Sequence, residues 1–181
     1  MAGLKKWGTV ALVSVVVICL IAWCWDAFGL RSPVFAFLVN WLAMTWVALV
    51  GQTVRFSFSP GSYDPQPFEQ NGVVYERAGI RLFKQLVRRG PLTMLSPTLH
   101  FPKEKTVTAL RALDNEMRKA ETGHVIIFAL MFVFIGYALL KGWLDAAAWL
   151  LLFSILINGY PIMLQRYNRI KLQGLISAQG G

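Results

Sequence analysis

The sequence has few charged residues, and they are unevenly placed. Only 15% of the 181 residues are Asp, Glu, Lys or Arg, against about 25% in an average soluble protein. Four stretches contain none of them: residues 7–25, 32–54, 122–140 and 146–165. Because a helix needs roughly 20 apolar residues to cross the hydrocarbon of a bilayer, this pattern predicts an all-α integral membrane protein with four transmembrane helices.

Cysteine is scarce, and its placement excludes two further features. Cys19 and Cys24 are five positions apart in the first apolar stretch, a spacing that does not bring them face to face and that forms no metal motif. The same stretch ends in Ala-Trp-Cys-Trp-Asp, without a small-x-small cleavage site. We therefore expect a retained membrane anchor rather than a cleaved signal peptide.

Several catalytic patterns are missing. The chain has no Gly-x-Ser-x-Gly elbow, and neither histidine, His100 or His124, precedes an acidic residue by five positions, as in the His-x4-Asp of many glycerolipid acyltransferases. A single Glu-x-x-His does not make a di-iron site, and no set of zinc ligands is present. We therefore expect no metal and no bound cofactor.

Acidic residues are half as numerous as basic ones, which gives a net charge of +9. In a four-span topology, the N-terminus, residues 55–121 and the C-terminus share one side of the membrane. That side holds every lysine and arginine except Arg31 and Lys141. The positive-inside rule then predicts a multi-pass protein of the cell (inner) membrane with both termini in the cytoplasm. No zinc-finger, RNP or basic-zipper pattern indicates a nucleic-acid partner.

The spans divide the chain into a transmembrane hairpin, a cytoplasmic or interfacial amphipathic segment, and a second transmembrane hairpin with a basic C-terminal tail: residues 1–54, 55–121 and 122–181. In the middle segment, proline and glycine predict loops over residues 57–72 and 91–105. Apolar residues at intervals of three and four predict one amphipathic helix over residues 73–90. A further helix from about residue 104 should run into the third span. We expect a helical cap at the membrane surface.

Polar residues gather where the third and fourth spans meet the cytoplasm. Glu121 and His124 are three positions apart and share a helix face. The short link at residues 141–145 makes the two spans antiparallel neighbours. The fourth span should then return a polar set to the same depth: Asn158, Gln165, Arg166, Tyr167, Asn168 and Arg169. Ionisable groups at this depth are costly and indicate function, with His124 as general base and Glu121 orienting it.

Each of these residues also has a structural interpretation. Arginines near a span end can anchor the helix, Tyr167 can belong to an aromatic belt, and Asn158 can bond a neighbouring helix. The basic face of residues 73–90 can dock either an acyl donor or anionic lipid headgroups. That face comprises Arg77, Arg81, Lys84, Arg88 and Arg89.

Three segments carry a resemblance to a known family. Residues 116–124 end in Glu-x-x-His, residues 158–172 contain Gln-Arg-Tyr-Asn-Arg, and residues 68–84 lead from Phe-Glu-x-x-Gly into a basic aromatic helix. Over roughly residues 40–172, the chain resembles the glycosyl-4,4'-diaponeurosporenoate acyltransferases. The resemblance implies transfer of a fatty acyl group from a cytosolic thioester, acyl-CoA or acyl-carrier protein, to a hydroxyl of a membrane lipid such as a glycosylated carotenoid. The arginines and Asn168 would hold the thioester oxyanion or the donor phosphates.

Two other functions remain open from the residues alone. A non-catalytic membrane scaffold or assembly subunit would use the basic cap as an interaction surface and the polar set to lock its helices. A lipid hydrolase would use the same polar set for another reaction. If the protein is an enzyme, we expect the polar residues to line a cavity open to the bilayer. If it is a scaffold, we expect them to fill a closed core.

The topology can be tested by labelling single cysteines at Gly3 and Trp143 in a variant that carries serine at Cys19 and Cys24. We expect a membrane-impermeant maleimide to label Trp143→Cys in intact cells. Gly3→Cys should react only after the cytoplasmic side is opened, because the basic residues gather there. Labelling of both positions from one side would contradict the four-span topology.

Overall fold

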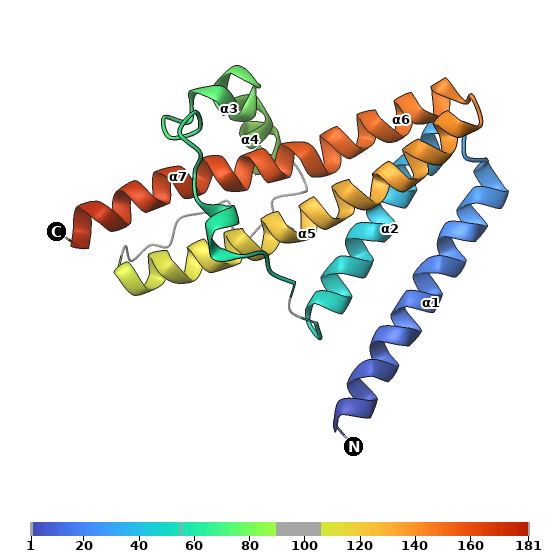
Figure 1. Ribbon diagram of the computed structural model, residues 1–181, viewed down its shortest axis with the longest axis horizontal. Helices are drawn as coiled ribbons and strands as arrows, with labels where there is room; N and C mark the ends of the chain where they lie inside the picture. Colours follow the sequence, from blue (N-terminus) through green and yellow to red (C-terminus); the bar gives the residue numbers. More distant parts are fainter. Residues whose placement is uncertain (1, 55, 90–105, 181) are drawn as a thin grey trace. The chain divides into compact units, whose positions relative to one another are not determined.

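The computed structural model describes residues 2–54, 56–89 and 106–180, and within these ranges it contains helices and no strand. The loop predicted over residues 91–105 lies outside the described residues. Figure 1 shows the helices, which are, in chain order, α1 (Ala2–Phe28), α2 (Pro33–Gly51), the 3-10 turn η1 (Pro60–Tyr63), α3 (Val73–Arg77), α4 (Ile80–Arg89), α5 (Val107–Leu140), α6 (Leu144–Ser154), the π-helical turn η4 (Ile155–Gly159) and α7 (Tyr160–Gly180).

Among the described residues, four helical stretches are long and apolar enough to cross a membrane, which confirms the predicted fold class. They are Lys5–Phe28, Pro33–Gly51, Val107–Leu140 and Leu144–Ala178. The third begins well before the apolar run, as expected for a cytoplasmic helix that continues into a span. The fourth combines α6, η4 and α7.

The chain forms two compact units, and helix α5 contributes to both. The first unit contains Met1–Phe56 and Gly123–Gly159, and the second contains Ser57–Thr122 and Tyr160–Gly181. Residues 123–159 thus belong to the unit of the first two helices, and residues 160–181 belong to the unit of the segment between the second and third spans.

The first unit is built on α2, which packs against α1 and α6. Its apolar core combines buried residues of α2, of the second half of α5 and of α6, among them Phe35, Val39, Ile127, Met131 and Leu150. Helix α1 pairs with α2 as a hairpin (Figure 1) but leaves most of its apolar side chains exposed. Exposed apolar surface of this kind is expected for a helix that faces lipid.

Local signals explain where the helices of the first unit begin and turn. Ser32 caps α2 by accepting a hydrogen bond from the backbone N–H of Val34, and Pro33 occupies the first turn, where its missing N–H costs nothing. Beyond the α1–α2 turn, Arg31 forms an ion pair with Asp145 at the start of α6 (2.9 Å). Both side chains are largely exposed, so this pair adds little stability.

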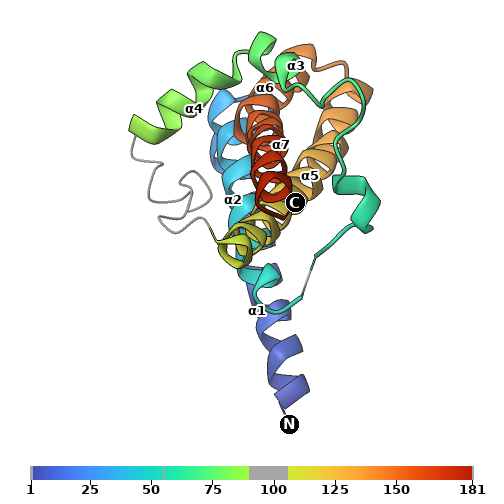
Figure 2. The ribbon, with the colours of Figure 1, turned by 90° about the vertical axis from the view of Figure 1, so that its left-hand side faces the viewer.

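The second unit is built on α7. One face of α7 packs against α3 and α4 through an apolar cluster that includes Tyr75, Ile80, Val87, Leu164 and Tyr167. Another packs against the first half of α5 through buried leucine and methionine side chains. Figure 2 shows α3 and α4 alongside α7, in agreement with the contacts between these helices.

The single helix predicted over residues 73–90 is wrong, because the segment forms two helices. Helix α3 ends at Arg77, and Gly79 adopts a left-handed conformation (φ 80°) before α4 begins at Ile80. Glycine takes this conformation at little steric cost, so Gly79 turns the chain between the two helices. The 3.6-residue periodicity continues across the turn, which is why the sequence pattern concealed it.

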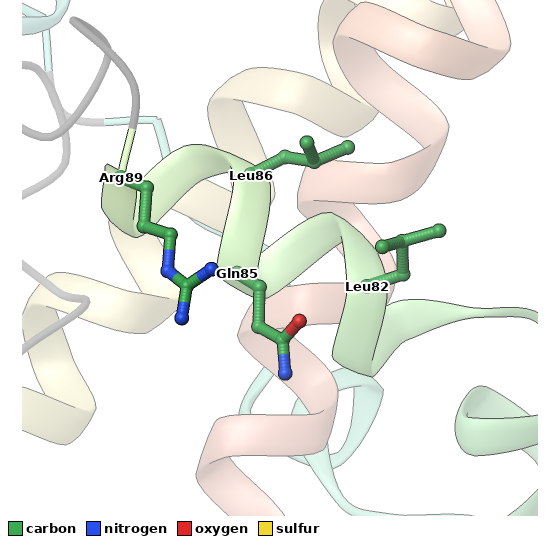
Figure 3. Close-up of a pocket in the computed structure, with 4 residues that line it drawn as sticks. All are labelled: Leu82, Gln85, Leu86 and Arg89. Carbon is green, nitrogen blue, oxygen red and sulfur yellow. The ribbon is translucent and has the colours of Figure 1, made fainter.

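The apolar stripe predicted for this segment is also divided. Ile80 and Val87 are buried, and the ring of Phe83 lies 5.0 Å from that of Tyr160, centroid to centroid. Leu82 and Leu86 point the other way and are each 63% exposed. Figure 3 shows these two leucines projecting from α4 beside a shallow hollow that they line with Gln85 and Arg89.

Candidate functional site

The polar residues singled out in the sequence form two clusters, one in each unit. In the first unit, His124 is half-buried on α5, and its Nδ1 lies 3.2 Å from Oδ1 of Asn158. Asn158 is fully buried, and its Nδ2 donates to Oδ1 of Asn40 on α2 (2.8 Å). Asn40 is fully buried as well, and its Nδ2 donates to the carbonyl of Ala36 (2.8 Å). Four polar groups from three elements thus form one chain of hydrogen bonds.

This chain determines the tautomer of His124. The carbonyl of Ala36 can only accept, so Asn40 must turn its amide nitrogen toward Ala36 and its oxygen toward Asn158. Asn158 must then donate to that oxygen, which leaves its own oxygen facing His124. The Nδ1 atom of a neutral His124 therefore carries the proton, and Nε2 keeps a free lone pair. A neutral imidazole held in this tautomer can act as a general base through Nε2.

Asn158 reaches both partners from a π-helical turn. Residues Ile155–Gly159 are wound as a π-helix between α6 and α7. Such turns contain one residue more than an α-helical turn and are frequent at functional sites. The extra residue rotates every side chain that follows it by about 100° around the helix axis. A count along an ideal helix therefore misplaces the side chains of α7.

Asn40 was not identified from the sequence as a site residue. A signal was present, because Asn40 stands in the middle of the uncharged stretch at residues 32–54. A buried amide inside a membrane-spanning helix needs hydrogen-bond partners. Its partner on η4 is more than a hundred positions away, and sequence spacing does not reveal such a contact.

The second cluster is a network of ions in the second unit. Nη1 of Arg166 lies 2.9 Å from Oε1 of Glu121. Nη1 of Arg169 lies 2.9 Å from Oε2 of the same carboxylate, but their alignment does not make a hydrogen bond, so this contact is purely an ion pair. Glu121 is 4% exposed and Arg169 is 1% exposed. Both side chains are therefore buried within the second unit.

Arg166 uses its whole guanidinium group on protein partners. Its Nε and Nη2 donate to the two oxygens of Glu69, at 2.9 and 2.7 Å, in a bidentate pair. The remaining N–H groups reach the backbone carbonyls of Ser62 and Asp64 as well as Glu121. A guanidinium with its donors engaged in this way holds the loop before α3 against α7 and has little capacity left for a substrate.

Glu69 and Tyr75 complete this network outside the spans. Tyr75 donates its hydroxyl to Glu69 Oε1. Burial raises the pKa of Glu69, but the hydrogen bonds from Arg166 and Tyr75 outweigh burial, and the net pKa is lowered. Burial and the hydrogen bond to Glu69 raise the pKa of Tyr75 to about 12. The carboxylate is therefore held charged and the phenol neutral. Neither residue was predicted from the sequence to belong to a site, although Glu69 lies in the Phe-Glu-x-x-Gly segment.

Arg169 is bound to the loop in a similar way. Its Nη2 donates to the backbone carbonyl of Tyr63, and its guanidinium lies 5.4 Å from the centroid of the Tyr63 ring. The Tyr63 hydroxyl accepts from the N–H of Phe58 and shares a hydrogen bond with Thr122 (2.5 Å). Both arginines of the Gln-Arg-Tyr-Asn-Arg segment therefore tie residues 57–72 to α7.

The rest of that segment faces α3 and α4. The Tyr167 hydroxyl donates to Glu76 (2.6 Å), and Asn168 accepts from Nζ of Lys84 (2.6 Å). Gly72 supports this packing in two ways: its φ is 67°, and a side chain there would lie 3.1 Å from the Tyr167 ring. Gln165, the first residue of the segment, is buried.

A family model described as glycosyl-4,4'-diaponeurosporenoate acyltransferase matches residues 60–178 of the chain. The match includes His124, Asn158 and the ion network of the second unit, but not Ala36 and Asn40. The chain belongs to this family. It is therefore an acyltransferase, and its four apolar helices make it a membrane protein. The search of curated proteins and the search of solved structures gave no significant match.

The structure assigns partners to the two residues expected to form the catalytic pair. His124 Nδ1 contacts Asn158, whereas the carboxylate of Glu121 contacts two arginines. Asn158 thus contacts the imidazole nitrogen that an orienting group would hold, and the orienting role expected for Glu121 stays a prediction. Of the expected docking residues, Lys84 is half-buried, whereas Arg77, Arg81, Arg88 and Arg89 are exposed on α3 and α4.

The buried ion pairs predict a large effect of Arg169→Met. We expect this variant to lose about 3 kcal/mol or more of unfolding free energy, since it leaves Glu121 with one arginine fewer in a buried position. Arg81→Met is the matched control, because Arg81 forms an ion pair with Glu76 but its side chain is 69% exposed. The measurement is reversible unfolding in mixed detergent micelles. Equal losses for both variants would contradict the structural role of Arg169.

The lowered pKa of Glu69 predicts that the free energy of unfolding decreases in acid. A carboxyl whose pKa is lower in the folded protein stabilises the fold above its usual pKa and loses this contribution as the pH falls through the folded value. Unfolding measured between neutral pH and about pH 3 should therefore show a loss of stability that is smaller in Glu69→Gln. Glu116→Gln, which changes an exposed carboxylate, should keep the wild-type slope. An unchanged slope in Glu69→Gln would refute this assignment.

Proposed function

We propose that the protein transfers a fatty acyl group from a thioester donor, acyl-CoA or acyl-carrier protein, to a sugar hydroxyl of a glycosylated carotenoid. The family match supports acyl transfer and this class of acceptor. The observation that carries the mechanism is the hydrogen-bond chain from Ala36 to His124, because it leaves Nε2 of His124 as a free base.

His124 acts in this proposal as the general base. Nε2 takes the proton from the acceptor hydroxyl while that oxygen attacks the thioester carbonyl carbon. Collapse of the tetrahedral intermediate breaks the carbon–sulfur bond, and the proton passes from His124 to the departing thiolate. The products are an ester and a free thiol, so the reaction needs no redox partner and no covalent intermediate on the protein.

Asn158 and Asn40 are positioning residues. Asn158 holds Nδ1 of the imidazole, and Asn40 holds the amide of Asn158 in the required orientation. Stabilisation of the imidazolium by an amide oxygen replaces the carboxylate of a Ser-His-Asp arrangement. In this proposal Glu121, Arg166 and Arg169 maintain the fold around the loop before α3 instead of contacting the thioester.

The expected topology fits this reaction. Acyl-CoA and acyl-carrier protein are soluble in the cytoplasm, whereas a carotenoid glycoside is held in the bilayer. The two substrates can meet only at the membrane surface. With both termini cytoplasmic, the loops and helices between the second and third spans face the side from which the donor arrives.

The proposal predicts graded effects along the hydrogen-bond chain. We expect His124→Ala to lower kcat by about 10²-fold or more, the usual contribution of a general base. Asn158→Leu and Asn40→Leu should each lower kcat about tenfold with little change in KM, since each removes one orienting hydrogen bond. Transfer of a labelled acyl chain from acyl-CoA, measured by mass spectrometry of the lipid product, provides the assay.

Thr45→Val is the matched control on α2. Within the part of the chain that the structure describes, the hydroxyl of Thr45 bonds the carbonyl of Trp41 on its own helix and no other group, so its loss should leave kcat unchanged. Normal turnover by purified, folded His124→Ala would exclude His124 as the base. A loss in Thr45→Val as large as that in Asn40→Leu would show that removing any polar side chain from α2 lowers kcat. The effect of Asn40→Leu would then give no support to Asn40 as a positioning residue.

A further inference from the structure

Two lysines lie against the same aromatic ring in the second unit. Nζ of Lys171 on α7 is 4.3 Å from the centroid of the Tyr167 ring, and Nζ of Lys84 on α4 is 6.0 Å from it. Lys84 also donates to Oδ1 of Asn168, a neutral acceptor that is 1% exposed. The side chain of Lys84 is thereby held in one place, partly removed from solvent.

These lysines differ from Arg166 and Arg169 on α7, each of which pairs with a carboxylate. Within residues 2–54, 56–89 and 106–180, neither Lys84 nor Lys171 forms an ion pair. Glu76 feels the charge of Lys171, but it already accepts from Tyr167 and pairs with Arg81 at 2.7 Å. Positive charge therefore exceeds negative charge at this point.

The environment of Lys84 is unfavourable to its charge. Burial lowers the pKa of Lys84 first, and the neighbouring charges of Lys171 and Arg88 lower it further. Placing like charges beside a half-buried ammonium costs free energy. An anion bound between these groups would remove that cost, because it would replace repulsion with two charge-assisted contacts.

We propose that Lys84 and Lys171 form a binding site for a phosphate group beside the Tyr167 ring. The ligand is a phosphate ester or diester whose oxygens contact both ammonium groups, and Asn168 fixes the position of Lys84. Lys171 on α7 is new to this site, since the basic face predicted from the sequence comprises residues 77–89 only. The proposal deepens the proposed function and depends on it only for the identity of the ligand.

Two phosphate sources have the required chemistry. Coenzyme A and the prosthetic group of acyl-carrier protein carry phosphates together with the acyl thioester, and phospholipids carry a phosphate at the membrane surface. Under the proposed function, the donor is the expected source. Direct binding measurements can separate the two sources and do not require turnover, so they remain informative if the proposed chemistry fails.

The test measures binding of coenzyme A to the full chain in detergent, and binding of vesicles containing phosphatidic acid to the reconstituted protein. We expect Lys84→Gln and Lys171→Gln each to weaken coenzyme A binding about tenfold. Lys84→Arg should retain most of it. Raising the salt concentration should weaken wild-type binding more than that of the double variant. His124→Ala should bind coenzyme A normally, which separates failure of the site from failure of the catalytic proposal.

Lys141→Gln is the matched control, because Nζ of Lys141 lies 5.8 Å from the centroid of the Tyr137 ring in the same kind of contact. It should leave both measurements unchanged. Loss of coenzyme A binding in the two lysine variants supports a donor site. Loss of vesicle binding alone supports a phosphate site and assigns it to lipid headgroups. Wild-type binding of both probes by a folded Lys84→Gln, Lys171→Gln double variant would overturn the proposal.

Discussion

A polar side chain buried in a membrane-spanning helix has to find its hydrogen bonds inside the protein, since hydrocarbon offers none. Asn40 and Asn158 meet this constraint through each other. Ala36 can only accept, so the direction of every donor and acceptor along the chain follows from it. His124 donates the last of these bonds through Nδ1, so its protonation pattern is decided by a backbone carbonyl on another helix. The catalytic proposal depends on this single sequence of contacts.

The second unit meets the related constraint on buried charge. Two glutamates and two arginines neutralise one another around the loop before α3, which is the condition under which buried ions are tolerated. This balance changes the interpretation of the Gln-Arg-Tyr-Asn-Arg segment. Arginines in such a segment are easily interpreted as substrate-binding residues. Here, however, they form ion pairs with Glu69 and Glu121. Lys84 and Lys171 have no carboxylate partner among the described residues, so they are the better candidates for an anionic ligand.

The sequence predicted much of the fold, because the strongest constraints on it are local. Uncharged stretches of about 20 residues have few alternatives to a transmembrane helix, and all four were found. The division of residues 73–90 was missed because Gly79 interrupts the backbone without interrupting the apolar repeat. A glycine followed by a new apolar run was an available signal for a helix end.

Polar residues of the candidate site could be named from the sequence, but their contacts with one another could not. Glu121 and His124 share a helix face, and this spacing suggested that the carboxylate orients the imidazole. The contact with Asn158 depends on a π-helical turn, which no regular periodicity anticipates, and on Asn40, whose place beside Asn158 is set by packing of α2 against α6. The partners of Arg166 come from a loop about a hundred residues earlier. Contacts of this range follow from tertiary structure and not from spacing.

The tautomer of His124 tests the central claim most directly. The chain has two histidines, so His100→Gln leaves one imidazole to observe by nitrogen NMR with isotope-labelled histidine. At alkaline pH, where the ring is neutral, we predict that the proton resides on Nδ1 and that Nε2 is bare. Asn40→Leu should mix the two tautomers, because it releases the amide of Asn158. A proton on Nε2 in the otherwise unaltered protein would contradict the account, since the proposed base would then have no lone pair to offer.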